Sequence, residues 1–173
     1  NFGGHRPGNN RYANSVVALR AADGSVAWHF QVVHHDVWDL DLPAQPILVD
    51  LERDGRRLPV VIQLTKQGLV FVLHRDTGEP VFPVEERPVP TDGVPGETLS
   101  PTQPFPTRPA PLGTLKYTSA DAWGFTLFDR EACRRKLASF GRAGLYEPPA
   151  FDGTLLTASA NNWGGAAFDP ERS

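Results

Sequence analysis

A repeated hairpin pattern constrains the fold of this chain more than any other feature of its sequence. Residues 17–28 (VALRAADGSVAW) align with residues 71–82 (FVLHRDTGEPVF) at an offset of 54 positions, 71 − 17. In each copy an apolar run leads to an Asp-Gly or Thr-Gly turn, and the turn to a second run that ends in an aromatic residue. Gly24 and Gly78 supply the positive φ that such turns require. Residues 127–130 and 167–170 are weaker echoes.

A repeat of roughly 40–55 residues built from antiparallel strands is typical of the blades of a β-propeller. The alternative is an ordinary β-meander with two similar hairpins. Further strand signals agree with either fold, since short β-branched or aromatic runs bounded by Gly, Pro, Asp or Asn occur at residues 15–19, 26–32, 47–51, 58–64 and 69–73. The sequence therefore predicts an all-β fold of antiparallel strands.

Prolines limit the helical content of the chain. The sequence has 17 of them, and they interrupt most windows that could otherwise be helical. One helix is predicted at residues 130–140, with Asp129 as its N-cap. The Pro-rich stretch at residues 83–111 is predicted to be an extended, polyproline-like excursion over the surface. A loop on the substrate side is the alternative for this stretch.

The bulk properties exclude several classes of partner and site. The net charge of −3 gives no reason to expect nucleic acid or an anionic membrane as a partner. No apolar run approaches the roughly 18–20 residues of a membrane span. The single Cys133 excludes an internal disulfide and a Cys-based zinc cluster. Both ends of the sequence resemble the interior of a longer protein, so we expect a segment of a larger chain.

Residues 34–41 (HHDVWDLD) contain two histidines, three aspartates and a tryptophan, more polar side chains than the end of a strand usually has. Asp39 is the predicted general base, and Lys66 follows 27 positions later, 66 − 39, after an apolar strand. Neighbouring strand ends can place a carboxylate and an ammonium around one bound molecule. His34 or His35 could donate a hydrogen bond to a substrate hydroxyl or orient Asp36.

Each of these side chains also has a purely structural alternative. Asp36 could cap a turn, and one of the two histidines could be a buried side chain with its hydrogen bonds satisfied. Trp38 could pack between blades. A lysine at a turn, such as Lys66, is usually solvated.

A metal site and a site for a flat ligand are further possibilities. In an extended segment Asp39 and Asp41 lie on the same face and could reach one hard cation such as calcium, but the remaining oxygen ligands are not obvious. Adjacent His34 and His35 point to opposite faces, which argues against zinc. Residues 161–165 (NNWGG) combine an amide, an indole and glycines that permit close approach of a flat ligand. An Asn-Asn turn is the alternative for that segment.

The motifs together resemble the pyrroloquinoline-quinone (PQQ)-dependent dehydrogenases. Residues 34–46 (HHDVWDLDLPAQP) resemble the active-site segment of that family, and the resemblance continues at residues 65–68, 100–105, 121–124 and 162–170. The double His and the PTQPF motif are most similar to the membrane-bound glucose dehydrogenase branch.

The resemblance implies an architecture, a reaction and a location. It implies an eight-bladed propeller of four-stranded antiparallel sheets, of which residues 1–173 supply about three blades. It implies oxidation of a sugar, such as glucose to gluconolactone, by hydride transfer to PQQ, with electrons passing to ubiquinone. It also implies a divalent metal, calcium or magnesium, and a periplasmic domain attached to the inner membrane through a segment outside this chain.

The resemblance also implies roles for individual residues. Asp39 matches the catalytic base, Lys66 matches the residue that hydrogen-bonds the quinone carbonyls, and Asn162 with Trp163 matches a motif that lines the cofactor. Asp39 and Asp41 are the candidate metal contacts. The family's stacking tryptophan and usual metal ligands are expected upstream of Asn1, so the chain alone is not expected to turn over substrate.

Two other functions fit the same residues. A quinate or polyol dehydrogenase of the same family would share these motifs, because no substrate-specificity loop is identifiable. A non-catalytic propeller of the same repeat type would keep the Gly turns and blade aromatics. It would have no reason to keep Asp39 together with Lys66.

Overall fold

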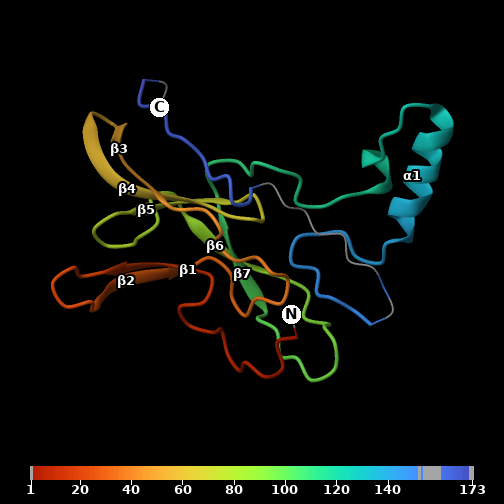
Figure 1. Cartoon of the computed structure of the whole chain (residues 1–173), viewed down its shortest axis with the longest axis horizontal. Helices are drawn as coiled ribbons and strands as arrows, with labels where there is room; N and C mark the ends of the chain where they lie inside the picture. The colour runs from red at the N-terminus through yellow and green to blue at the C-terminus, as the bar shows by residue number, and fades with distance from the viewer. Residues whose placement is uncertain (1, 152, 154–160, 172–173) are drawn as a thin grey trace.

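The computed structural model of the chain describes residues 2–151, 153 and 161–171. Within those ranges the strands form three antiparallel sheets (Figure 1). The strands are β1 (Ser15–Leu19), β2 (Val26–Gln31), β3 (Ile47–Arg53), β4 (Arg56–Leu64), β5 (Val70–His74), β6 (Val84–Pro88) and β7 (Thr102–Pro106). The sheets are β1–β2, β3–β4–β5 and β6–β7. The predicted antiparallel all-β character is confirmed.

The hairpin repeat is confirmed down to individual hydrogen bonds. In the first copy Arg20 N donates to Ser25 O and Gly24 N to Arg20 O, and in the second His74 N donates to Glu79 O and Gly78 N to His74 O, all at 2.7–2.8 Å. Every partner in the second copy lies 54 positions after its counterpart in the first. Gly24 and Gly78 have φ of 71° and 75°, the left-handed conformation that their turns were predicted to need.

The two copies also contact each other. Trp28, at the end of the first copy, donates from Nε1 to the carbonyl of Arg75 in the turn of the second copy at 3.0 Å. A Cβ placed on Gly78 would lie 2.5 Å from the indole ring of Trp28, so glycine is also required there by close approach. A Cβ placed on Gly24 would have no neighbouring atom within 4 Å.

β5 is buried on both faces and separates two cores. Phe71 and Leu73 belong to the larger core, together with Val32 and Val33 after β2. Val70 and Val72 alternate with them and enter a second core on the opposite face of the sheet. An apolar run without polar alternation is expected when both faces of a strand are covered.

The stretch at residues 83–111 differs from the predicted polyproline-like excursion. β6 and β7 pair along their whole length within it, from Val84 opposite Pro106 to Pro88 opposite Thr102. Among the described residues β7 pairs with β6 alone, so Pro104 and Pro106 can lack an N–H without breaking an inner ladder. The prolines of this stretch therefore mark an edge strand.

The helix α1 (Leu127–Ser139) starts three positions before the predicted start at Arg130. Thr126 is the N-cap and accepts a hydrogen bond from Asp129 N, so the prediction of Asp129 as the cap was wrong. The 3-10 helix η1 (Ser119–Asp121) lies beside α1, and both lie apart from the sheets (Figure 1). Across the described residues, no helix has both the length and the apolar character needed to cross a membrane.

The two turn glycines form a matched pair for a stability test. We expect Gly24→Ala to cost about 1–2 kcal/mol, because the new Cβ is strained at positive φ. Gly78→Ala should cost about 1–3 kcal/mol more, because the Cβ also collides with Trp28. Melting temperatures of the two variants measure this difference. Equal losses would contradict the packing of Trp28 on the second turn.

Candidate active site

The loop at residues 32–46, called the site loop below, joins β2 to β3 and is organised by Asp36. The carboxylate of Asp36 accepts hydrogen bonds from Trp38 N at 2.9 Å, from Leu40 N at 2.9 Å and from Asn14 Nδ2 at 3.0 Å. Two of these bonds give backbone amides of the loop a hydrogen-bond acceptor. The structural alternative for Asp36 is therefore confirmed.

Asp39 lies between two buried residues and is itself exposed. Trp38 and Leu40 are 8% and 4% exposed, whereas the side chain of Asp39 is 71% exposed. Trp38 packs edge-on against Tyr146 and donates from Nε1 to the carbonyl of Glu147 at 2.7 Å, so its role is in the core. Asp39 has φ of 68°, a conformation that costs energy for a residue with a Cβ. The loop thus holds one carboxylate outward at some conformational cost.

Lys66 returns to Asp39 as the sequence predicted. It lies in the β4–β5 turn, where Gly68 N donates to the carbonyl of Thr65 at 2.9 Å. The Lys66 ammonium donates to Asp39 O at 2.9 Å, to Asp39 Oδ2 at 3.3 Å and to Asp41 Oδ1. The Lys66 side chain is only 13% exposed, so it is not a solvated turn lysine.

Opposing influences act on the pKa of Lys66. Burial is the largest and lowers the pKa, because it disfavours the charged amine. The hydrogen bonds and charges of Asp41 and Asp39 together outweigh burial, and the net pKa is raised above its ordinary 10.5. Lys66 is therefore a cation throughout the physiological range.

Asp39 and Asp41, the predicted metal contacts, both contact the same group, which is the ammonium of Lys66. Both carboxylates bind this ammonium. In the part of the chain that the structure describes, no group of three or more His, Cys, Asp or Glu side chains could hold a metal ion.

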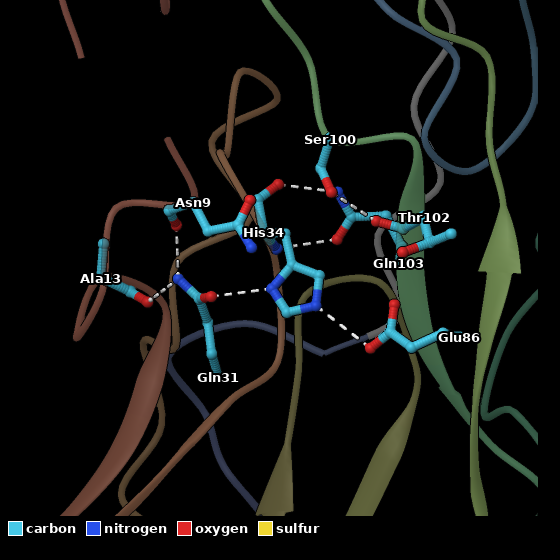
Figure 2. Close-up of polar contacts among 8 residues, drawn as sticks. All are labelled: Asn9, Ala13, Gln31, His34, Glu86, Ser100, Thr102 and Gln103. Atoms are coloured by element: carbon cyan, nitrogen blue, oxygen red, sulfur yellow. Dashed lines mark hydrogen bonds and ion pairs between the residues drawn. The ribbon is translucent and has the colours of Figure 1, made fainter. Parts of the chain in front are cut away.

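Both ring nitrogens of His34 contact protein side chains (Figure 2). Its Nδ1 contacts Gln31 Oε1 at 2.7 Å, and its Nε2 contacts Glu86 Oε1 at 3.1 Å. The Gln31 amide nitrogen donates to three backbone carbonyls, those of Asn9, Asn10 and Ala13. Because this fixes the oxygen of Gln31 toward the ring, Nδ1 of His34 is a donor. The contact with Glu86 is an ion pair when the ring is protonated.

His35 is buried beside the N-terminal segment. It is 2% exposed, and its Nδ1 bonds the carbonyl of Gly8 at 2.6 Å. A Cβ on Gly3 would lie 2.4 Å from Nε2 of His35, so the ring fills the space above that glycine. The structure thus gives both histidines contacts within the protein, and their action on a substrate stays a prediction.

Trp163 and its glycines lie beside the end of the site loop. A cleft of about 500 Å³ is lined by residues 45–48 and by Trp163, Gly164, Gly165 and Ala166. Trp163 is 76% exposed, and Asn162 is also exposed. Lys66 contacts the middle of the same loop, so Lys66 and Trp163 border one continuous segment, residues 39–48. Residues 154–160, just before this motif, lie outside the described residues.

Two buried glutamines that bind the site loop were not selected from the sequence. Gln103, on β7, binds the backbone of His34, and Gln63, on β4, donates to the carbonyl of Ala44. Both are 2% exposed or less. The sequence shows only a polar residue at each position, and a polar residue in a strand more often faces solvent than binds a loop.

Comparison with known proteins identifies the family. The whole chain, residues 1–173, matches the family model described as PQQ, glucose/ethanol/alcohol dehydrogenase, β-propeller domain. The chain belongs to this family. The resemblance inferred from residues 34–46 is therefore confirmed, and the β-propeller is the fold of the domain rather than a simple meander.

Three relatives show how far the similarity extends. Quinoprotein glucose dehydrogenase of Escherichia coli (strain K12) is 43% identical over 178 residues, 99% of this chain and 22% of that protein. Quinoprotein glucose dehydrogenase of Gluconobacter oxydans (strain 621H) is 41% identical over 99% of this chain and 22% of that protein. The glycerol dehydrogenase large subunit of Gluconobacter oxydans (strain 621H) is 43% identical over 84% of this chain and 20% of that protein. The chain thus spans about a fifth of these relatives.

The raised pKa of Lys66 gives a direct test of the ion cluster. A raised lysine pKa adds stability that is complete below the ordinary value of 10.5 and is lost as pH rises through the raised pKa. Asp41→Asn should move the titration of Lys66 to lower pH, and by more than Asp39→Asn does. The pH dependence of amine labelling at Lys66, read by mass spectrometry, measures both shifts. A titration unchanged in Asp41→Asn would argue against this cluster, and Asp76→Asn is the control at an exposed turn.

Proposed function

We propose that the protein to which this chain belongs is a quinoprotein dehydrogenase that oxidises a sugar, most directly glucose to gluconolactone, with PQQ as cofactor. The observation that carries the proposal is the largely buried Lys66 ammonium in contact with the exposed carboxylate of Asp39. The glucose dehydrogenases among the relatives, which cover nearly the whole chain, support the choice of a sugar.

The residues at this site suit an oxygen-rich, planar quinone. The three hydrogens of the Lys66 ammonium have three acceptors, and the contact with Asp39 Oδ2, at 3.3 Å, is the longest of them. That contact is the easiest to exchange for a quinone carbonyl. Trp163 and Gly164 offer an exposed indole and an open backbone beside the cleft. Lys66, Asn162 and Trp163 are therefore the proposed cofactor contacts.

The proposed mechanism is base-assisted hydride transfer. When bound, PQQ supplies an electrophilic quinone carbon that accepts the hydride of the substrate carbinol. The carboxylate of Asp39 takes the hydroxyl proton, for which it is suited by its outward position. The Lys66 ammonium stabilises the negative charge that develops on the neighbouring oxygen. Loss of either group should cost on the order of 10²–10³ in rate.

A divalent cation, calcium or magnesium, is part of the proposal. Asp39 and Asp41 can offer carboxylate oxygens, which such cations prefer. Because Lys66 contacts both carboxylates, a cation that binds them must replace at least one of these contacts. The remaining ligands would come from parts of the protein outside this chain.

The wider architecture and location are inferred from the family resemblance. We infer an eight-bladed propeller of four-stranded sheets, to which this chain contributes about three blades. We also infer a periplasmic position, attachment to the inner membrane outside this chain, and ubiquinone as electron acceptor.

A quinate or polyol substrate is the second candidate. The glycerol dehydrogenase large subunit is 43% identical to this chain, the same as one of the glucose dehydrogenases. A non-catalytic scaffold is less consistent with the contact between Lys66 and Asp39. Dye-linked oxidation of glucose, glycerol and quinate by the complete protein compares the substrates.

Asp39→Asn in the complete, PQQ-loaded protein tests the role of the base. We expect the rate of dye-linked oxidation to fall by at least about 10²-fold, since an amide cannot accept the hydroxyl proton. PQQ should stay bound, as followed by its absorption. Asp76→Asn, which changes an exposed carboxylate in the turn after β5, should keep its activity. Wild-type turnover by Asp39→Asn would remove Asp39 from its assigned role.

A further inference from the structure

Gln103 binds the backbone of His34 on both sides (Figure 2). His34 N donates to Gln103 Oε1 at 2.8 Å, and Gln103 Nε2 donates to His34 O at 2.7 Å. The Gln103 side chain thereby takes the place of a neighbouring strand at that point of the loop. Gln103 is fully buried, so water cannot substitute for these two bonds.

The same hairpin also holds the ring of His34. Glu86 on β6 contacts Nε2 of His34, and Glu86 lies opposite Pro104, the residue after Gln103. On its other side the ring contacts Gln31 at the end of β2. His34 is therefore fixed in backbone and side chain by the β6–β7 hairpin and by β2.

Hydrogen bonds of Asp36 stabilise the short segment between His34 and Asp39. Two residues after His34, the carboxylate of Asp36 binds the amides of Trp38 and Leu40, which flank Asp39 on both sides. We therefore expect a displacement of His34 to shift the segment that carries Asp39. At the far end of the loop, Gln63 holds the carbonyl of Ala44 at 3.1 Å.

We propose that Gln103 is a positioning residue for Asp39: its carboxamide fixes the backbone of His34 and thereby sets where Asp39 lies against Lys66. The effect on catalysis rests on the proposed function of Asp39. The effect on the Lys66 contact does not, because that contact exists in the chain without cofactor.

Gln103→Glu separates positioning from general packing, because the two side chains have the same shape. In this variant an ionised carboxylate has no hydrogen to donate to His34 O. Its negative charge would also face the partial negative charge of that carbonyl oxygen. A protonated carboxyl restores one donor and one acceptor, and burial raises the pKa of a carboxyl. We compare kcat of the PQQ-loaded variant with kcat of the wild-type protein at the same pH. At high pH the kcat of the variant should be lower by about 10–100-fold, and as pH falls it should return toward the wild-type value. KM should change less than kcat.

Gln103→Met and Val72→Ala are the comparison variants. Gln103→Met has neither donor nor acceptor, so its kcat should be low at every pH. Val72, 7% exposed, packs in the second core away from the site loop, so Val72→Ala should lower the melting temperature while kcat stays near wild type. If Gln103→Met does not fold, Gln103→Glu purified at acidic pH still supports the comparison.

Labelling of Lys66 in the PQQ-free protein gives a readout without activity. At one fixed high pH, Gln103→Met and Gln103→Glu should raise the rate of amine labelling at Lys66, because its contacts with the site loop loosen, and Val72→Ala should not. An unchanged labelling rate at Lys66 in both Gln103 variants, no recovery of kcat in Gln103→Glu at low pH, or an equal loss of kcat in Val72→Ala would overturn the proposal. Wild-type protein that oxidises no alcohol would overturn the proposed function and leave the labelling result intact.

Discussion

Two backbone amides and one side-chain amide converge on the carboxylate of Asp36, and the site loop owes its shape to that convergence. A loop of this kind lacks a strand partner, so its polar groups need acceptors from side chains. Asp36 provides them on either side of Asp39, and Gln103 and Gln63 hold the loop near its ends. The strained φ of Asp39 persists because its neighbours are fixed.

The electrostatics of the site follow from that geometry. Lys66 is mostly buried, which by itself favours the neutral amine, and it stays charged because Asp41 and Asp39 face it. The lysine and the proposed base therefore stabilise each other in the chain without cofactor. Binding of an electron-rich oxygen at Lys66 would weaken its hold on Asp39 and leave that carboxylate free to accept a proton.

Features with local causes were predictable from the sequence. Strands β1 to β5 and both glycine turns follow from β-branched runs and from the φ that the turns need, and the approach of Lys66 to Asp39 follows from residue spacing and strand direction. Features that depend on distant contacts were not predictable. Composition marked residues 83–111 as surface, but Gln103 within them is buried because it satisfies His34, 69 positions away. Likewise, the N-cap of α1 depends on whether Thr126 or Asp129 turns its side chain toward the first amides.

Binding of PQQ to a Lys66→Met variant tests the central claim most directly. In the complete protein, titration of PQQ followed by its absorption should show an affinity at least about tenfold lower than wild type, a loss of about 1.4 kcal/mol or more. Lys136→Met, at an exposed position on α1, should bind PQQ as wild type does. A Lys66→Met variant with wild-type affinity would contradict the assignment of Lys66 as the residue that holds the quinone.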